Sequence, residues 1–427
     1  MYWAYRFSAL FLFFIPILAL TQDAESAFKN FDYIYKSNIK SVKFHPFDSE
    51  TDYPLMSLNS PGHFLLSFDD LEAYTKDFSY KIIHCDANWQ VSQDIDAMDY
   101  IDGFQENRFY NSESSFNTRV PYTHYEVKIP NEDVKWTKSG NYLLKVYRDN
   151  DENDLIITRR FMIVDTKMKV VPTMRSTAMP PNSASHQELS FTIQHTGIRI
   201  GNVEEQIKVA ILQNGRWDNC IKNPEATYIK EEEIGYNMLG AILFPGYKEF
   251  RPLDLRSFKF RTLQVERMEQ YRDGFELWLF EDVNRSYQPH VFTHDLNGNF
   301  FLQTHEERNA QLEGEYGQVN FSLKSLSPFN GSVYLLGGFN NFCASEAFKM
   351  QYNPQRRGYE LSTQLKNGFY DYYYGLIAEG SDQKNITAIE GASFETENDY
   401  LFLVYLKDFG GLYDQLVAVQ KLNTRPK

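Results

Sequence analysis

The chain has 427 residues, which is enough for two to four domains of ordinary size. Its 29 Tyr and 34 Phe favour β-sheets, because aromatic side chains fit a pleated surface. Asp and Glu (57) outnumber Lys and Arg (43), so the formal net charge is −14. An acidic surface argues against nucleic acid and anionic lipid as partners.

The first residues have the pattern of an export signal. Arg6 precedes an apolar run over residues 7–20, which is too short to span a bilayer as a helix. We expect a cleaved signal peptide over residues 1–21 and a soluble, exported mature chain without a transmembrane segment. Cys85, Cys220 and Cys343 are few cysteines for such a protein, and their odd number leaves at least one unpaired.

Residues 28–166 are expected to form a first β-sandwich. Ile39–His45 and His63–Asp69 alternate apolar and polar residues at the strand period, and turn signals follow at residues 139–140 and 149–154. Six or seven short strands with such punctuation and no helical period predict an antiparallel sandwich.

Two further sandwiches are expected, over residues 167–305 and 306–425. Strand-like runs such as Ile207–Gln213 and Lys259–Glu266 fill the first of these ranges, and a polar stretch at residues 304–317 marks the boundary. The predicted fold is therefore all-β, with three consecutive immunoglobulin-like sandwiches of the early-set type after the signal peptide.

Residues 86–122 form a long connection between two predicted strands. A connection of this length without regular structure is usually functional or disordered, and its many apolar residues argue against disorder. Two interpretations stay open: a partner-binding loop presented by the β scaffold, or a cover for one end of the sandwich. For Trp89 and Tyr122, which adjoin strand ends, internal packing is favoured. The candidate partner-binding residues are Trp89, Tyr100, Asp102, Phe104, Phe109, Tyr110, Phe116 and Tyr122.

The sequence lacks the motifs of common catalytic and metal sites. It has no G-x-S-x-G, H-E-x-x-H or C-x-x-C pattern, although paired carboxylates for glycoside hydrolysis need only proximity in space. Residues 84–86 join histidine, cysteine and aspartate, with His124 across the loop, but neighbouring strand residues point to opposite faces. We expect Cys85 to be packed, and His290 and His294 to be a surface pair. We therefore expect no enzyme, cofactor, metal or small-molecule substrate.

The last third of the chain carries a more specific pattern. VYLLGGFNNF at residues 333–342 and LKNGFYDYYYG at residues 365–375 resemble the early-set immunoglobulin-like modules of starch- and glycogen-binding proteins. Those modules bind sugars on stacked tryptophans, whereas here no tryptophan follows Trp278 and Phe342 stands where one is common. The resemblance implies the fold and keeps glycan binding as an alternative function.

Most of the chain resembles one family. YKIIHCDANW, DYIDGFQENRF, SSFNTRVPYTHYEVKIPN and SGNYLLKVY resemble the N-terminal domain of the type IX secretion system plug protein, and FETENDYLFLVY with GGLYDQLVAVQ resembles its C-terminal end. The resemblance implies a non-catalytic periplasmic subunit at the inner face of the outer membrane, in the secretion machinery of gliding and pathogenic Gram-negative bacteria. In that family the plug closes the periplasmic mouth of a giant outer-membrane β-barrel translocon, so the resemblance implies this barrel as the partner.

Overall fold

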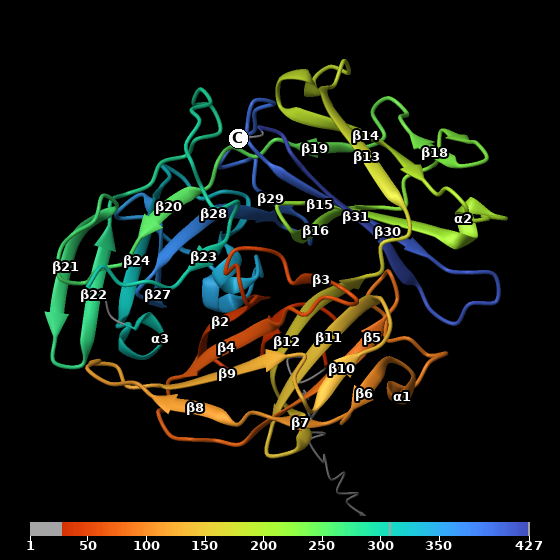
Figure 1. Cartoon of the computed structure of the whole chain (residues 1–427). Helices are drawn as coiled ribbons and strands as arrows, with labels where there is room; N and C mark the ends of the chain where they lie inside the picture. Colours follow the sequence, from red (N-terminus) through yellow and green to blue (C-terminus); the bar gives the residue numbers. More distant parts are fainter. Residues whose placement is uncertain (1–27, 307–308, 426–427) are drawn as a thin grey trace, which may run out of the picture.

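The computed structural model describes residues 28–306 and 309–425, which form three β-sandwiches packed against one another (Figure 1). In the described chain the helices are single turns, and strands carry the architecture. The expectation of an all-β fold built from sandwiches is confirmed. The signal peptide expected over residues 1–21 lies outside the described residues.

The first sandwich, at the bottom of Figure 1, packs two sheets around one apolar core. One sheet has the order β1-β12-β11-β5-β7 with β3 parallel to β12, and the other has the order β2-β4-β9-β8. Its elements are β1 (Tyr33–Ile34), β2 (Ile39–Pro46), β3 (Leu55–Ser57), β4 (Phe64–Asp70), β5 (Phe78–Cys85), α1 (Ala97–Tyr100), β6 (Ile101–Gly103), β7 (Asn107–Arg108), β8 (Asn111–Ser114), β9 (Thr123–Ile129), β10 (Val134–Trp136), β11 (Gly140–Arg148) and β12 (Asp151–Val164).

The second sandwich combines residues from two distant parts of the chain. One sheet has the order β13-β14-β18-β17 with β19 on β14, and the other has the order β16-β15-β30-β31. Its elements are β13 (Lys169–Ser176), η1 (Asn182–Ala184), β14 (His186–Gln194), α2 (Val203–Gln206), β15 (Ile207–Gln213), β16 (Arg216–Lys222), β17 (Tyr228–Ile229), β18 (Glu233–Tyr236), β19 (Leu243–Pro245), β30 (Asp399–Leu406) and β31 (Gln415–Asn423).

The third sandwich is inserted between β19 and β30 and lies at the left of Figure 1. In one sheet β20, β23, β25 and β29 all pair with β28, and the other sheet has the order β21-β22-β24-β27-β26. Its elements are β20 (Arg251–Asp254), β21 (Val265–Tyr271), β22 (Gly274–Leu279), β23 (Phe300–Phe301), α3 (Ala310–Glu313), β24 (Tyr316–Lys324), β25 (Gly331–Leu336), η2 (Gly338–Asn340), η3 (Glu346–Phe348), β26 (Gln351–Asn353), β27 (Gly358–Lys366), β28 (Phe369–Ala378) and β29 (Lys384–Asn385).

The strand pairing does not follow the division expected at residues 305 and 306. β20, β21 and β22, which precede that point, pair with strands of the inserted sandwich, and β30 pairs with β15 from Ile207↔Leu406 to Gln213↔Tyr400. The three sandwiches are therefore not consecutive along the chain. The chain returns to the second sandwich at β30 because this strand has apolar residues on both faces. One face belongs to the core of the second sandwich, and the other face contacts the first sandwich.

Candidate partner-binding surface

The segment 86–122 crosses one end of the first sandwich and is more regular than expected. It contains α1, β6, β7 and β8, which the sequence did not indicate because each has only two to four residues. β6 pairs with β10, β7 with β5 and β8 with β9, so backbone hydrogen bonds fasten the segment to the sandwich along its length.

Trp89, at the start of the segment, lies between the first and second sandwiches. The Asp86 carboxylate accepts two backbone N–H groups of the turn that carries Trp89. The indole meets Trp217 edge to face, with ring centroids 5.0 Å apart, and the Arg160 guanidinium lies 4.6 Å from its centroid. Trp89 belongs to an apolar cluster that joins β11 and β12 to β15, β30 and β31. Its side chain is therefore an internal anchor.

Tyr122, at the end of the segment, is buried against the inserted sandwich. Its hydroxyl donates to the carbonyl oxygens of Gln311 and Gly314 at 2.9 and 3.1 Å. Its ring meets Tyr316 edge to face, and the Lys366 ammonium lies 4.1 Å from the ring centroid. The segment is thus held by a different sandwich at each end.

A buried ion pair reinforces the contact beside Tyr122. Lys366 Nζ lies 2.7 Å from Asp69 Oδ2, to which the Tyr316 hydroxyl also donates at 2.7 Å, and His124 Nδ1 lies 2.6 Å from Asp69 Oδ1. Burial opposes ionisation of Asp69, but Lys366 and His124 together hold the pKa of this carboxyl below its usual value. Asp69 and His124 come from the first sandwich, while Lys366 and Tyr316 come from the inserted one.

Two other candidate residues pack into the first sandwich. Tyr100 is buried against Tyr142, and Phe109 meets Phe68 and Phe78 edge to face. Both belong to or pack against the core of that sandwich. Four candidate residues therefore pack internally, at three different places. Trp89 contacts the second sandwich, Tyr122 contacts the inserted sandwich, and Tyr100 and Phe109 pack in the first sandwich.

The remaining candidates lie at the surface. Phe104, Tyr110 and Phe116 are 66%, 77% and 49% exposed, and Asp102 is exposed as well. Met98, which is 81% exposed on α1, was missed by the sequence analysis because a methionine in an irregular stretch gives no sign of which way it faces. We call Met98, Asp102, Phe104 and Tyr110 the loop surface. Phe116 is separate from it, since its backbone N–H donates to Leu312 of the inserted sandwich.

The sequence of the first sandwich matches the model of a known protein family. Residues 39–165 match the model described as type 9 secretion system plug protein, first domain. This sandwich belongs to the plug-protein family. The match ends at residue 165 and does not extend to the C-terminal segments for which the same resemblance was expected.

Nearly the whole chain is similar to a solved structure. A crystal structure of a hypothetical protein from Parabacteroides merdae is 27% identical, with a TM-score of 0.89, and the alignment covers 93% of this chain and 100% of that chain. No curated protein matches the sequence. The arrangement of the three sandwiches therefore occurs in a second protein as well.

The expected histidine and cysteine positions in the plug-protein domain do not converge. His84 contacts Ser92 and the Ser139 carbonyl oxygen, whereas His124 pairs with Asp69 on the other sheet. Cys85 is buried, and burial raises the pKa of its thiol to about 12. Within residues 28–306 and 309–425, no three His, Cys, Asp or Glu side chains gather as metal ligands, and all three cysteines are free.

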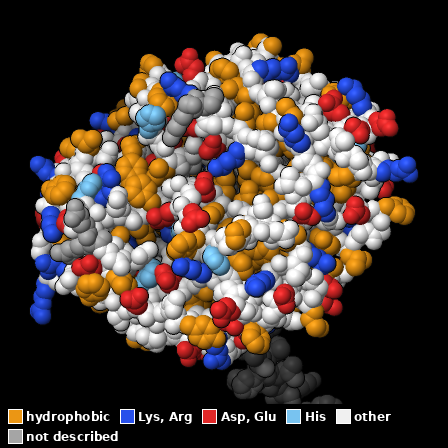
Figure 2. All heavy atoms as spheres, in the orientation of Figure 1, with side chains coloured by type: hydrophobic (Ala, Val, Ile, Leu, Met, Phe, Trp, Pro, Cys, Tyr) orange, Lys and Arg blue, Asp and Glu red, His pale blue; other side chains and the backbone are white. Residues whose placement is uncertain are grey.

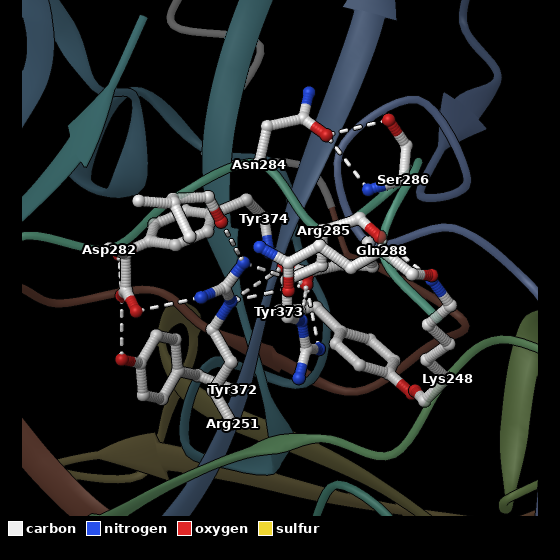
Figure 3. A network of polar contacts seen from close by, with 12 residues as sticks. Lys248, Arg251, Asp282, Asn284, Arg285, Ser286, Gln288, Tyr372, Tyr373 and Tyr374 are labelled. Carbon is white, nitrogen blue, oxygen red and sulfur yellow. Dashed lines mark hydrogen bonds and ion pairs between the residues drawn. The ribbon is translucent and has the colours of Figure 1, made fainter. Parts of the chain in front are cut away.

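A buried charged network lies where the chain passes between the second and inserted sandwiches (Figure 3). Arg251 donates to both oxygens of Glu390 at 3.1 Å and to Asp282 at 2.7 Å, and Arg285 also pairs with Glu390. The hydroxyls of Tyr372 and Tyr374 donate to Asp282. These charges have partners of opposite sign, so none of them is left buried without compensation.

The inserted sandwich, which would bind sugar in the alternative function, has a single tryptophan, Trp278. Trp278 is on β22, where the Arg267 guanidinium lies 3.6 Å from its ring centroid. Phe342 packs against Phe250 with centroids 6.0 Å apart, and the Arg216 guanidinium lies 4.7 Å from its centroid. A cation therefore lies over the ring of Phe342, which stands where the sugar-binding modules often carry a tryptophan. In the described residues no helix is long and apolar enough to cross a membrane.

Proposed function

We propose that this chain is a non-catalytic plug subunit that binds and closes the periplasmic end of the giant outer-membrane β-barrel translocon of the type IX secretion system. The observation that carries the proposal is the plug-protein first domain at residues 39–165, which holds the loop surface. The subunit would act in the periplasm, at the inner face of the outer membrane.

The rigid setting of the loop surface supports a plugging role. Trp89 fixes one end of the segment to the second sandwich and Tyr122 fixes the other to the inserted sandwich. A plug subunit must keep its conformation when it binds at a pore. Its binding energy is expected to come mainly from a few aromatic side chains that are already held in position. Phe104 and Tyr110 are exposed aromatic side chains on such a fixed segment.

The test is affinity purification of the tagged protein from detergent-solubilised envelope of a type IX-secreting bacterium. We expect one very large outer-membrane β-barrel protein to be recovered in near-equal amount. The double variant Phe104→Ala/Tyr110→Ala should lose most of it and remain folded, because neither side chain belongs to a core. Tyr287→Ala removes an aromatic that is 98% exposed in the inserted sandwich and serves as the matched control.

Two outcomes would count against the proposal in different ways. Recovery of the wild-type protein without any barrel would reject the plug function. Recovery of the barrel in equal amount with the wild type and the double variant would keep the function and reject the loop surface as its contact.

A further inference from the structure

A cavity of about 510 Å³ lies where the three sandwiches meet. Its walls come from β2 and β12 of the first sandwich, from the turn before β16 in the second, and from β23 and the stretch after η2 in the inserted one. β3, β16 and β23 lie together in the middle of the view in Figure 1, and Figure 2 shows hydrophobic side chains gathered near the centre of this face. The volume is within the range of about 300–1,000 Å³ typical of small-ligand sites.

Two buried cations on the cavity wall, Lys43 and Arg159, are attracted by Glu50 and Asp32 but form no direct ion pair with them. Lys43 and Arg159 are 6% and 5% exposed. Lys43 Nζ donates to the Phe300 carbonyl oxygen at 2.5 Å, and Arg159 donates to the Thr158 carbonyl oxygen at 3.0 Å. Neither forms an ion pair with a carboxylate of the described residues. Most of their eight N–H donors are thus left for another group.

The other cations of the wall are already satisfied. Arg216 and Lys384 share the carboxylate of Asp218. Arg160 donates to the Asn30 carbonyl oxygen and stacks on Trp89. The unused positive charge in the cavity therefore belongs to Lys43 and Arg159.

Burying these charges is costly, because the attraction of Glu50 and Asp32 compensates only part of the hydration that the two ions lose. The same burial shifts the pKa of both groups. Burial, reinforced by repulsion from Arg159 and opposed by Glu50, lowers the pKa of Lys43 to about 8. Burial likewise lowers the pKa of Arg159 to about 10, although the attraction of Asp32 opposes this shift. An anion in the cavity would reverse both effects.

We propose that this cavity is a binding site for a small ligand that joins one carboxylate to an apolar body, with the carboxylate held by Lys43 and Arg159. A guanidinium fork matches the two oxygens of a carboxylate. Asp32, Glu50 and Asp52 also line the cavity, and they repel a singly charged carboxylate less than a phosphate of higher charge. The rings of Phe44, Phe300 and others on the wall suit the apolar part.

The direct test is calorimetric titration of the full chain with N-acetylphenylalanine and with its uncharged amide. We expect the carboxylate to bind at millimolar concentration or below and the amide to bind at least about tenfold more weakly, because charge-assisted hydrogen bonds are lost. Equal binding of the two compounds, or no binding of the carboxylate, would overturn the proposal. Tighter binding of inorganic phosphate would overturn the choice of ligand class.

Variants locate the site. Lys43→Met and Arg159→Met should each weaken binding of N-acetylphenylalanine about tenfold or more, whereas Lys43→Arg should retain it. Lys40→Met is the matched control, since Lys40 is on the same strand and does not line this cavity. Undiminished binding by both methionine variants would place the ligand elsewhere. A peptide with a free C-terminal phenylalanine, compared with its amidated form, then shows whether the ligand is a chain terminus or a free acid.

Discussion

Lys366 of the inserted sandwich forms an ion pair with Asp69 of the first sandwich, with 2.7 Å between Nζ and Oδ2 and both side chains withdrawn from solvent. The pair lies in a network with His124 and Tyr316, and Lys366 also donates to the Gln311 carbonyl oxygen. It joins residues 297 positions apart in the sequence. The first sandwich is therefore joined to the inserted sandwich by this ion pair and to the second sandwich by the apolar cluster around Trp89.

Removing one partner of this ion pair should weaken the whole assembly. Lys366→Met leaves the Asp69 carboxylate buried without its main countercharge, which costs about 3–5 kcal/mol of unfolding free energy. Replacing both partners, as in Asp69→Asn/Lys366→Met, should cost less than the single change because no uncompensated charge stays buried. Urea unfolding followed by tryptophan fluorescence measures both.

The matched control is Lys349→Met, which removes an ion pair between a partly exposed lysine and the exposed Glu346 on the same sandwich. Its cost should stay below about 1 kcal/mol. If Lys366→Met were no more destabilising than Lys349→Met, the buried pair would not hold the sandwiches together.

A second prediction concerns pH. Burial, reinforced by the neighbouring Asp295, raises the pKa of Asp371 to about 8. An unfolded aspartate has a pKa of about 3.9. The folded state therefore favours the protonated carboxyl, and its contribution to stability is present below pH ~3.9 and is lost as the pH rises through the folded pKa.

Asp371→Asn should remove this pH dependence. The amide oxygen can still accept the backbone N–H groups of Leu296 and Gly298, which now donate to Asp371 Oδ2. Relative to the wild type, the variant should gain stability between about pH 4 and the folded pKa of about 8, by about 1.4 kcal/mol for each pH unit, and the difference should level off above that pKa. Asp382→Asn, at an exposed position, is the control. Parallel stability curves for Asp371→Asn and the wild type would contradict the assignment.

The strands of the first sandwich were largely readable from the sequence. Alternating apolar residues predicted a strand at Ile39–His45, and the structure has β2 over Ile39–Pro46. The pairing of β30 with β15 was not readable, because strand alternation identifies a strand and its faces but not its partner. An insertion that returns the chain to an earlier sheet leaves no local mark, so a linear order of domains was the natural expectation.

The candidate site was readable only as a segment. Phe104 and Phe109 are both aromatic and five positions apart, yet Phe104 is exposed and Phe109 packs against the core. Elements of two to four residues have too few positions to show a period, so the sequence cannot assign their faces. The internal packing favoured for Trp89 and Tyr122 agrees with their burial, since residues beside strand ends are drawn to the scaffold.

A third prediction concerns the thiols. Cys85, Cys220 and Cys343 are free, and burial raises the pKa of Cys85 and Cys220 to about 12 and about 11. We expect a thiol reagent to modify these two cysteines only slowly in the native protein and all three rapidly in urea, because the thiolate is the reactive form. A reductant should leave the unfolding midpoint unchanged. A lower midpoint in reductant would reveal a disulfide.

The last prediction separates two roles within residues 86–122. Trp89→Ala empties a buried contact between sandwiches and should lower the unfolding free energy by about 3–5 kcal/mol. Phe104→Ala removes an exposed ring and should change it by less than about 0.5 kcal/mol. Recovery of the barrel protein at a temperature where both variants are folded gives the complementary readout, in which Phe104→Ala should be the weaker binder. The opposite ranking in either measurement would contradict the assignment of Trp89 to internal packing and of Phe104 to partner contact.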